Sequence, residues 1–82
     1  MKLERAFGIS LGTKRRSAGM TQEQLAELLG TQATAISRME SGHTSPSLKM
    51  IGRLALALRT TPSNLLARAE EIQRDNAPEQ DQ

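Results

Sequence analysis

Cysteine is absent from this sequence of 82 residues, and His43 is the only histidine. Disulfide scaffolds, thiol catalysis and thiolate metal sites are therefore excluded, and a single imidazole cannot build a histidine cluster around a metal. We accordingly predict no metal and no cofactor. The lack of disulfides suits a reducing compartment, so we expect a cytoplasmic protein.

Aromatic residues and long apolar runs are also scarce. Phe7 is the only aromatic side chain, which disfavours recognition of single strands or RNA by base stacking. Groove reading of a duplex stays open, because it uses hydrogen bonds and methyl contacts. The longest apolar run, Leu54 to Leu58, is far too short for a membrane span, and the charged N-terminus does not resemble a signal peptide. We predict no membrane association.

The charges are distributed unevenly along the chain. Residues 1–69 contain ten Lys and Arg against four Glu, a net charge of +6, whereas residues 70–82 carry −4. A basic body with an acidic tail fits a domain that binds a polyanion. An ordinary solvated surface accounts for the same count equally well.

An enzyme is the class that the sequence favours least. One His and no Cys supply no nucleophile–base pair, unless a Lys or carboxylate acts in a pocket, and a chain this short has little room for one. Gly8 and Gly12 fall inside a predicted helix rather than after a strand, so they do not form a glycine loop that cradles phosphate. We predict that the protein is not an enzyme.

Hydrophobic period and capping residues predict five helices and no strand. The predicted ranges are Leu3–Ala18, Gln22–Leu29, Gln32–Ser41, a fourth from Ser45 or Ser47 to Leu58, and a fifth that begins at Pro62 and includes Ile72. Thr21 and Gln24 predict a capping box for the second helix, and Gly30 predicts its end. Residues 1–74 are expected to form one domain, and residues 75–82 a disordered acidic tail.

Two apolar stripes are expected to face the core. Leu3, Phe7 and Leu11 share one face of the first helix at a spacing of four. In the fourth helix the period is followed by Leu48, Ile51, Leu54, Ala55 and Leu58.

The segment from Thr21 to Ser41 has the pattern of a helix-turn-helix, two short helices joined by a few residues that include Gly30. The second helix of such a pair has to enter a DNA groove about 12 Å wide. Its residues Ala33, Thr34, Ala35 and Ser37 are small, which allows its backbone to sit deep in the groove. Gln22 opens the first helix, where exposed amides form an anion site.

The stretch TQEQLAELLGTQATAISRMESG closely resembles the helix-turn-helix of the Cro/CI-type (XRE) family, the lambda-repressor-like DNA-binding domains. KRRSAGMTQEQLA before it is similar to the family's basic end of the first helix, and PSLKMIGRLALAL with TPSNLL to its last two helices. The similarity covers about Phe7 to Leu66. It implies a compact five-helix, all-α, lambda-repressor-like fold in which helices 2 and 3 form the helix-turn-helix.

The resemblance also implies roles for individual residues. Gln22 stands where family members contact a phosphate, and His43 and Thr44 lie in a loop that touches the DNA backbone. Bases or flanking phosphates are contacted from the positions of Gln32, Ala33, Thr34, Ser37 and Arg38. Arg15 and Glu40 match a pair that forms an internal salt bridge between the first and third helices.

Three positions depart from the family's pattern. Arg59 stands where the fourth helix usually stops at Gly, and Met50 stands where that helix's capping box usually has an acid. Gln32 replaces the Ser or Asp that often begins the recognition helix. The first two departures concern helix caps only, whereas the third makes the target sequence harder to infer.

The leading functional hypothesis is a dimeric transcriptional regulator, expected to be a repressor, that reads a palindromic operator in double-stranded DNA. A homodimer through the fifth helix is expected, with Leu65, Ala69 and Ile72 at the interface, because no other predicted element of the monomer is expected to cover Ala69 and Ile72. The alternatives are an antitoxin, with the acidic tail bound to a toxin, and a restriction-modification controller protein.

Overall fold

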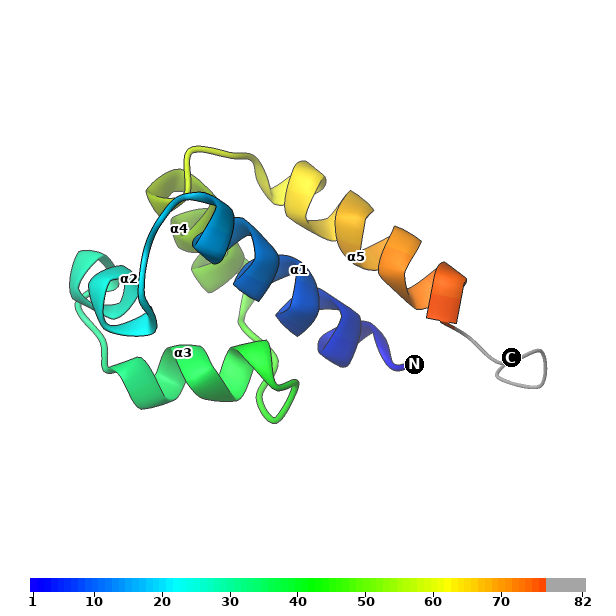
Figure 1. The fold of residues 1–82 in the computed structure, drawn as a ribbon, viewed down its shortest axis with the longest axis horizontal. Coiled ribbons are helices and arrows are strands. Elements are labelled where there is room, and N and C mark those ends of the chain that lie inside the picture. The colour runs from blue at the N-terminus through cyan, green and yellow to red at the C-terminus, as the bar shows by residue number, and fades with distance from the viewer. Residues whose placement is uncertain (77–82) are drawn as a thin grey trace.

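The computed structural model describes residues 1–76, which form five α-helices and no strand. The helices are α1 (Leu3–Ser17), α2 (Gln22–Leu29), α3 (Ala33–Glu40), α4 (Leu48–Ala57) and α5 (Pro62–Asn76) (Figure 1). The predicted all-α class and five-helix architecture are therefore confirmed. None of these helices is long and apolar enough to cross a membrane.

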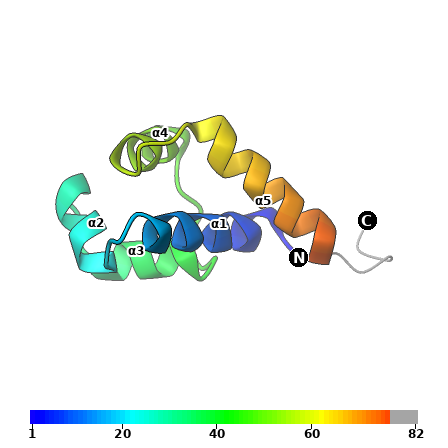
Figure 2. The ribbon, with the colours of Figure 1, turned by 45° about the horizontal axis from the view of Figure 1, so that its top comes forward.

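Helix α1 lies at the centre of the molecule. Helix α5 runs antiparallel to α1 and packs along it, while α3 packs on another side of α1 (Figure 1). Figure 2 shows α4 above α1, α3 just below α1 and α2 at one end, while α5 slopes from the level of α4 down to that of α1. All five helices contribute side chains to one core: Ala6, Phe7, Leu11, Leu25, Ala26, Leu29, Ile36, Met39, Leu54, Ala55, Leu58, Leu65, Ala69 and Ile72.

The ends of the two motif helices follow from local residues. The Thr21 hydroxyl accepts from the Gln24 amide at 3.1 Å, and the Gln24 side chain accepts from the Thr21 amide at 2.8 Å, which confirms the capping box. Gly30 ends α2 with φ of +68°. Gln32 precedes α3 as its N-cap instead of being its first residue, and its side chain makes no capping hydrogen bond.

Gly8 allows α1 and α3 to approach each other closely. A Cβ built at Gly8 would lie 2.3 Å from the carbonyl oxygen of Glu40 and 2.6 Å from that of Met39. Both atoms belong to the backbone, so no side-chain movement relieves such a contact. The glycine that weakens α1 as an isolated helix is therefore required by the packing of α3.

The expectation for α5 is wrong in one respect. Ala69 and Ile72 are only 0% and 7% exposed, and with Leu65 they belong to the core. They are covered because α5 packs along α1 as well as against α4, so the expected uncovered stripe does not exist in the monomer. Helix α5 also continues through Asp75 and Asn76, past the predicted start of the tail; residues 77–82 lie outside the described residues.

Two leucines placed in the core by periodicity are exposed instead. Leu48 is 80% exposed and Leu3 is 42% exposed. Each is the first residue of its helix, where the periodic stripe extends beyond the neighbours that would cover it. The end of α4 is also unusual, because Arg59 has a φ of +56°, a left-handed conformation that costs a non-glycine residue about 1–2 kcal/mol.

Candidate nucleic-acid interface

Helices α2 and α3 are joined by a short turn that the left-handed Gly30 begins. The Thr31 amide donates to the Ala26 carbonyl at 2.9 Å and closes the end of α2. The inner face of α3 is fixed by Ile36 and Met39, which are buried in the core. The opposite face of α3 is therefore turned to solvent.

The structure places the expected contact residues of α3 mostly on this outer face. Gln32, Thr34, Ser37 and Arg38 are exposed, and Ala33 is half-buried at the first turn. None of these five side chains has a hydrogen bond or an ion pair with another described residue. Within this part of the chain their donors and acceptors are therefore unused.

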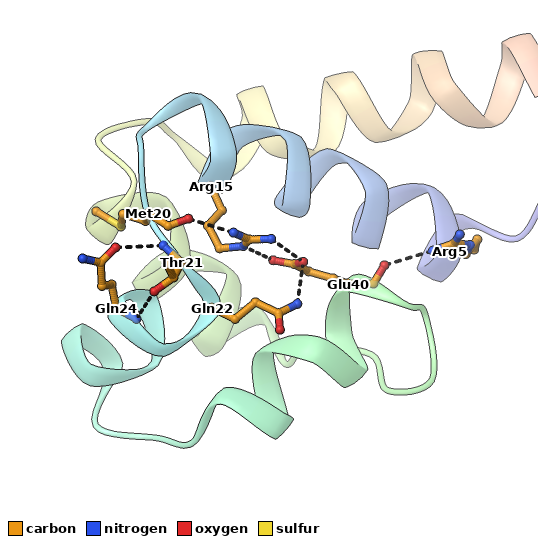
Figure 3. A network of polar contacts seen from close by, with 7 residues as sticks. All are labelled: Arg5, Arg15, Met20, Thr21, Gln22, Gln24 and Glu40. Atoms are coloured by element: carbon orange, nitrogen blue, oxygen red, sulfur yellow. Dashed lines mark hydrogen bonds and ion pairs between the residues drawn. The ribbon is translucent and has the colours of Figure 1, made fainter.

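Arg15 and Glu40 form a short ion pair that joins α1 to α3 (Figure 3). Arg15 Nε lies 2.6 Å from Glu40 Oε2, and Arg15 Nη2 lies 3.0 Å from Glu40 Oε1, so the contact is bidentate. Both side chains are only about a tenth exposed. Arg15 Nη1 also donates to the Met20 carbonyl at 2.7 Å, which ties the segment before α2 to the same site.

Gln22 joins this ion pair, a contact that the sequence analysis missed. Its Nε2 donates to Glu40 Oε1 at 3.0 Å (Figure 3). The contact links the first residue of α2 to the last residue of α3. A primary amide has two N–H donors, so Gln22 keeps one donor and its carbonyl for another partner.

The surroundings of Glu40 favour its ionised form. Burial alone would raise the pKa of Glu40, but hydrogen bonds from Arg15 and Gln22 and the charges of Arg15 and Arg16 outweigh it. The pKa of Glu40 therefore lies below its ordinary value. The hydrogen bond to Glu40 raises the pKa of Arg15 in turn. The pair is fully charged at neutral pH.

A second arginine holds the same end of α3. Arg5 Nη1 donates to the backbone carbonyl of Glu40 at 3.1 Å (Figure 3). A cation at a helix C-terminus is favourable because the last carbonyls lack partners within the helix. Arg5 and Arg15 thus fix the orientation of α3 from its C-terminal end, while its N-terminal turn stays exposed.

The loop after α3 places His43 and Thr44 beside the end of that helix. The amides of His43 and Thr44 both donate to the Arg38 carbonyl, at 2.9 and 3.3 Å. The exposed His43 ring has Nδ1 2.6 Å from Ser41 Oγ. Among residues 1–76 there is no group of acidic or histidine side chains that suits a metal.

The sequence and the structure are both similar to those of known regulators. A family model described as helix-turn-helix matches residues 11–65. Over 44 residues the chain is 46% identical to an uncharacterized HTH-type transcriptional regulator of Methanothermobacter thermautotrophicus. That match takes in 54% of this chain and 64% of the relative, so the chain spans less than two thirds of it.

Two solved structures have the same arrangement of helices. The clp gene regulator ClgR from C. glutamicum superposes with a TM-score of 0.84 at 25% identity, covering 87% of this chain and 91% of that one. The restriction-modification controller protein C.AhdI from Aeromonas hydrophila superposes with a TM-score of 0.71 at 36% identity, covering 74% and 92%. Because the family model takes in most of the chain and the fold agrees, the protein belongs to the helix-turn-helix family of the Cro/CI type.

Proposed function

We propose that the protein is a dimeric transcriptional regulator, acting as a repressor, that binds double-stranded DNA sequence-specifically with α3 in the major groove. The observation that carries this proposal is the state of α3. Its inner face is buried, its C-terminal end is tied to α1 by Arg5 and Arg15, and its outer polar side chains have no partner within residues 1–76. A rigid helix with free polar groups suits base recognition.

The proposed contacts divide into positioning and reading. The free N–H of Gln22 donates to a phosphate, and His43 and Thr44 approach the backbone from the loop. The bases are read from the exposed turn of α3 by Gln32, Thr34 and the methyl group of Ala33. Ser37 and Arg38, one turn further, contact bases or flanking phosphates.

Dimerisation follows from the small size of one such contact. A single helix in the groove covers one half-site, whereas a two-fold dimer reads a palindrome with half-sites about 34 Å apart. Two copies also double the number of phosphates contacted. The proposed operator is therefore palindromic, and the amount of dimer sets its occupancy.

The relatives support regulation as the role and favour one specific setting. Two of them carry regulator in their names, and the controller protein C.AhdI is 36% identical to this chain. A restriction-modification controller is therefore the second candidate function. It uses the same DNA-binding surface, and an operator beside restriction or modification genes would distinguish it.

The test is a salt titration of binding to a labelled duplex, followed by fluorescence anisotropy. With roughly 6–8 phosphate contacts per dimer, affinity should fall by about a thousandfold or more between 50 and 200 mM salt. Arg38→Ala should make the dependence on salt shallower, whereas Arg74→Ala, near the far end of α5, should not. An affinity that stays flat over this range contradicts the proposal.

A further inference from the structure

Helix α4 has an apolar outer face that no residue among 1–76 covers. Leu48 and Leu56 are 80% and 81% exposed. Gly52 lies midway between them, and a Cβ built there meets no atom within 4 Å. We call these three residues the α4 stripe. Contiguous apolar groups of this kind on a small chain indicate an interaction surface.

The C-terminal half of the α4 stripe borders a hollow between α4 and α2. The hollow has a volume of about 390 Å³ and is lined by Leu28, Leu56 and Ala57 among other residues. Leu28 is itself 60% exposed. Arg53 crosses between the two helices to donate to the Leu29 carbonyl, which holds its side chain beside the hollow. At the N-terminal end of the α4 stripe, by contrast, the Leu48 side chain projects into solvent.

The pattern is self-complementary. Leu48 and Leu56 stand four residues, about 6 Å, on either side of Gly52. A two-fold axis through Gly52 that sets two α4 helices antiparallel brings the Leu48 of each copy over Leu56 of the other, at the hollow. Gly52 has no side chain to hold the two helices apart. Such a contact is isologous, as in most homodimers.

We infer that the α4 stripe and the adjoining hollow are the surface through which two copies of this chain dimerise, with Leu48 of each copy seated between Leu28 and Leu56 of the other. The inference rests on the dimer of the proposed function and replaces the interface expected on α5. No side chain that is proposed to contact DNA belongs to this surface, so the outer face of α3 stays free.

Charge supports a second copy as the occupant. Leu48 is followed by the exposed, basic Lys49, and Leu28 is preceded by the exposed, acidic Glu27. With Leu48 of one copy seated beside Leu28 of the other, we expect Lys49 to lie near Glu27 of the partner subunit. Neither side chain has an ion-pair partner among the described residues of its own chain.

Sedimentation equilibrium of the full chain tests the interface. The wild type should dimerise, and Leu56→Asp or Leu48→Asp should raise the dimer dissociation constant by on the order of a hundredfold or more. Both residues are exposed, so circular dichroism should show an intact fold. The control is Leu3→Asp, an exposed leucine outside the surface, which should leave the dimer unchanged. A monomeric wild type, or a dimer unaffected by Leu56→Asp, overturns the inference.

A charge exchange tests the orientation. Lys49→Glu and Glu27→Lys should each weaken the dimer severalfold, and the double variant should restore it. If the double variant dimerises as weakly as the sum of the two single effects predicts, Lys49 does not meet Glu27 across the interface and the proposed orientation is wrong.

DNA binding separates this inference from the function. The monomeric variant Leu56→Asp should still bind a half-site weakly, and its affinity should depend less steeply on salt than that of the wild type. A wild-type dimer that dissociates on Leu56→Asp yet binds no DNA would contradict the proposed function while supporting the interface.

Discussion

The side-chain amide of Gln22 donates to Oε1 of Glu40 at 3.0 Å, so the first residue of α2 is held by the last residue of α3. The same oxygen accepts from Arg15. One carboxylate therefore sets the position of the residue proposed to bind a phosphate and the orientation of the helix proposed to read bases. Positioning and reading are mechanically joined at Glu40.

Gln22→Ala should weaken binding to all DNA sequences alike, because a phosphate contact has no base preference. The variant also loses a hydrogen bond to a charged group, and such a bond contributes at most about 1.5–3 kcal/mol to the free energy of unfolding. Because water reaches this half-buried site, we expect a loss at the low end of that range or below it. Anisotropy with two unrelated duplexes measures the first effect, and urea unfolding the second. A change in the ratio of the two affinities would contradict the assigned role.

Arg15→Ala should cost far more stability than Lys14→Ala. Removing Arg15 leaves the carboxylate of Glu40 largely buried without its ion pair, at about 3–5 kcal/mol. The Lys14 side chain has no hydrogen bond or ion pair with another described residue, so Lys14→Ala should be within about 0.5 kcal/mol of neutral. Thermal melts of the two variants decide the matter, and equal melting temperatures would mean that the pair contributes nothing to stability.

The stability of the fold should fall in acid partly through Glu40. Its folded pKa lies below the ordinary value of 4.5, so the unfolded chain takes up this proton first as the pH falls. The contribution of the pair is complete above 4.5 and is lost as the pH falls through the folded pKa. Glu40→Gln has no carboxylate to titrate at this position. The difference between its free energy of unfolding and that of the wild type should therefore shrink between about pH 5 and pH 3. A stability difference that stays constant over that range would show that Glu40 has the same pKa in the folded and unfolded chain.

Gly8→Ala should destabilise the protein although alanine is the better helix former. Helix propensity favours the change by about 0.5–1 kcal/mol, but the new Cβ would overlap the Glu40 and Met39 carbonyls, and overpacking costs about 1–3 kcal/mol or more. Gly12→Ala is the matched control in the same helix. A Cβ built at Gly12 would lie 3.2 Å from both Arg16 Nη1 and Glu40 Oε1, so these side chains need to shift far less than the backbone carbonyls opposite Gly8. Unfolding experiments that rank Gly12→Ala as the more damaging variant would contradict this account.

Features encoded by neighbouring residues were predictable from the sequence. The capping box of Thr21 and Gln24 and the stop at Gly30 fix α2 to the residue, because each acts within one turn. The start of α3 was predicted one residue early, since Gln32 has helix-forming chemistry but serves as an N-cap. The periodicity of α4 was correct, yet it cannot show that Leu48 extends beyond the core.

Two features that depend on distant contacts were not predicted, although the family resemblance did imply the ion pair of Arg15 and Glu40. The burial of Ala69 and Ile72 requires α5 to lie along α1, an arrangement fixed by contacts such as the bond from Ser10 Oγ to the Leu65 carbonyl, 55 residues away. Gln22 reaches Glu40 only because the turn at Gly30 folds α3 back beside α2. No local pattern in one sequence carries that information.

The central claim is that the outer face of α3 reads bases in duplex DNA. Selection of bound duplexes from a random pool tests it most directly, with the wild type, Gln32→Ala, Thr34→Ala and, as control, Gln22→Ala. The account predicts a palindromic motif with half-sites about 10–10.5 base pairs apart. Gln32→Ala and Thr34→Ala should change the bases preferred within each half-site, while Gln22→Ala should select the wild-type motif at lower affinity. A pool with no enriched motif, or a motif that only Gln22→Ala alters, would contradict the claim.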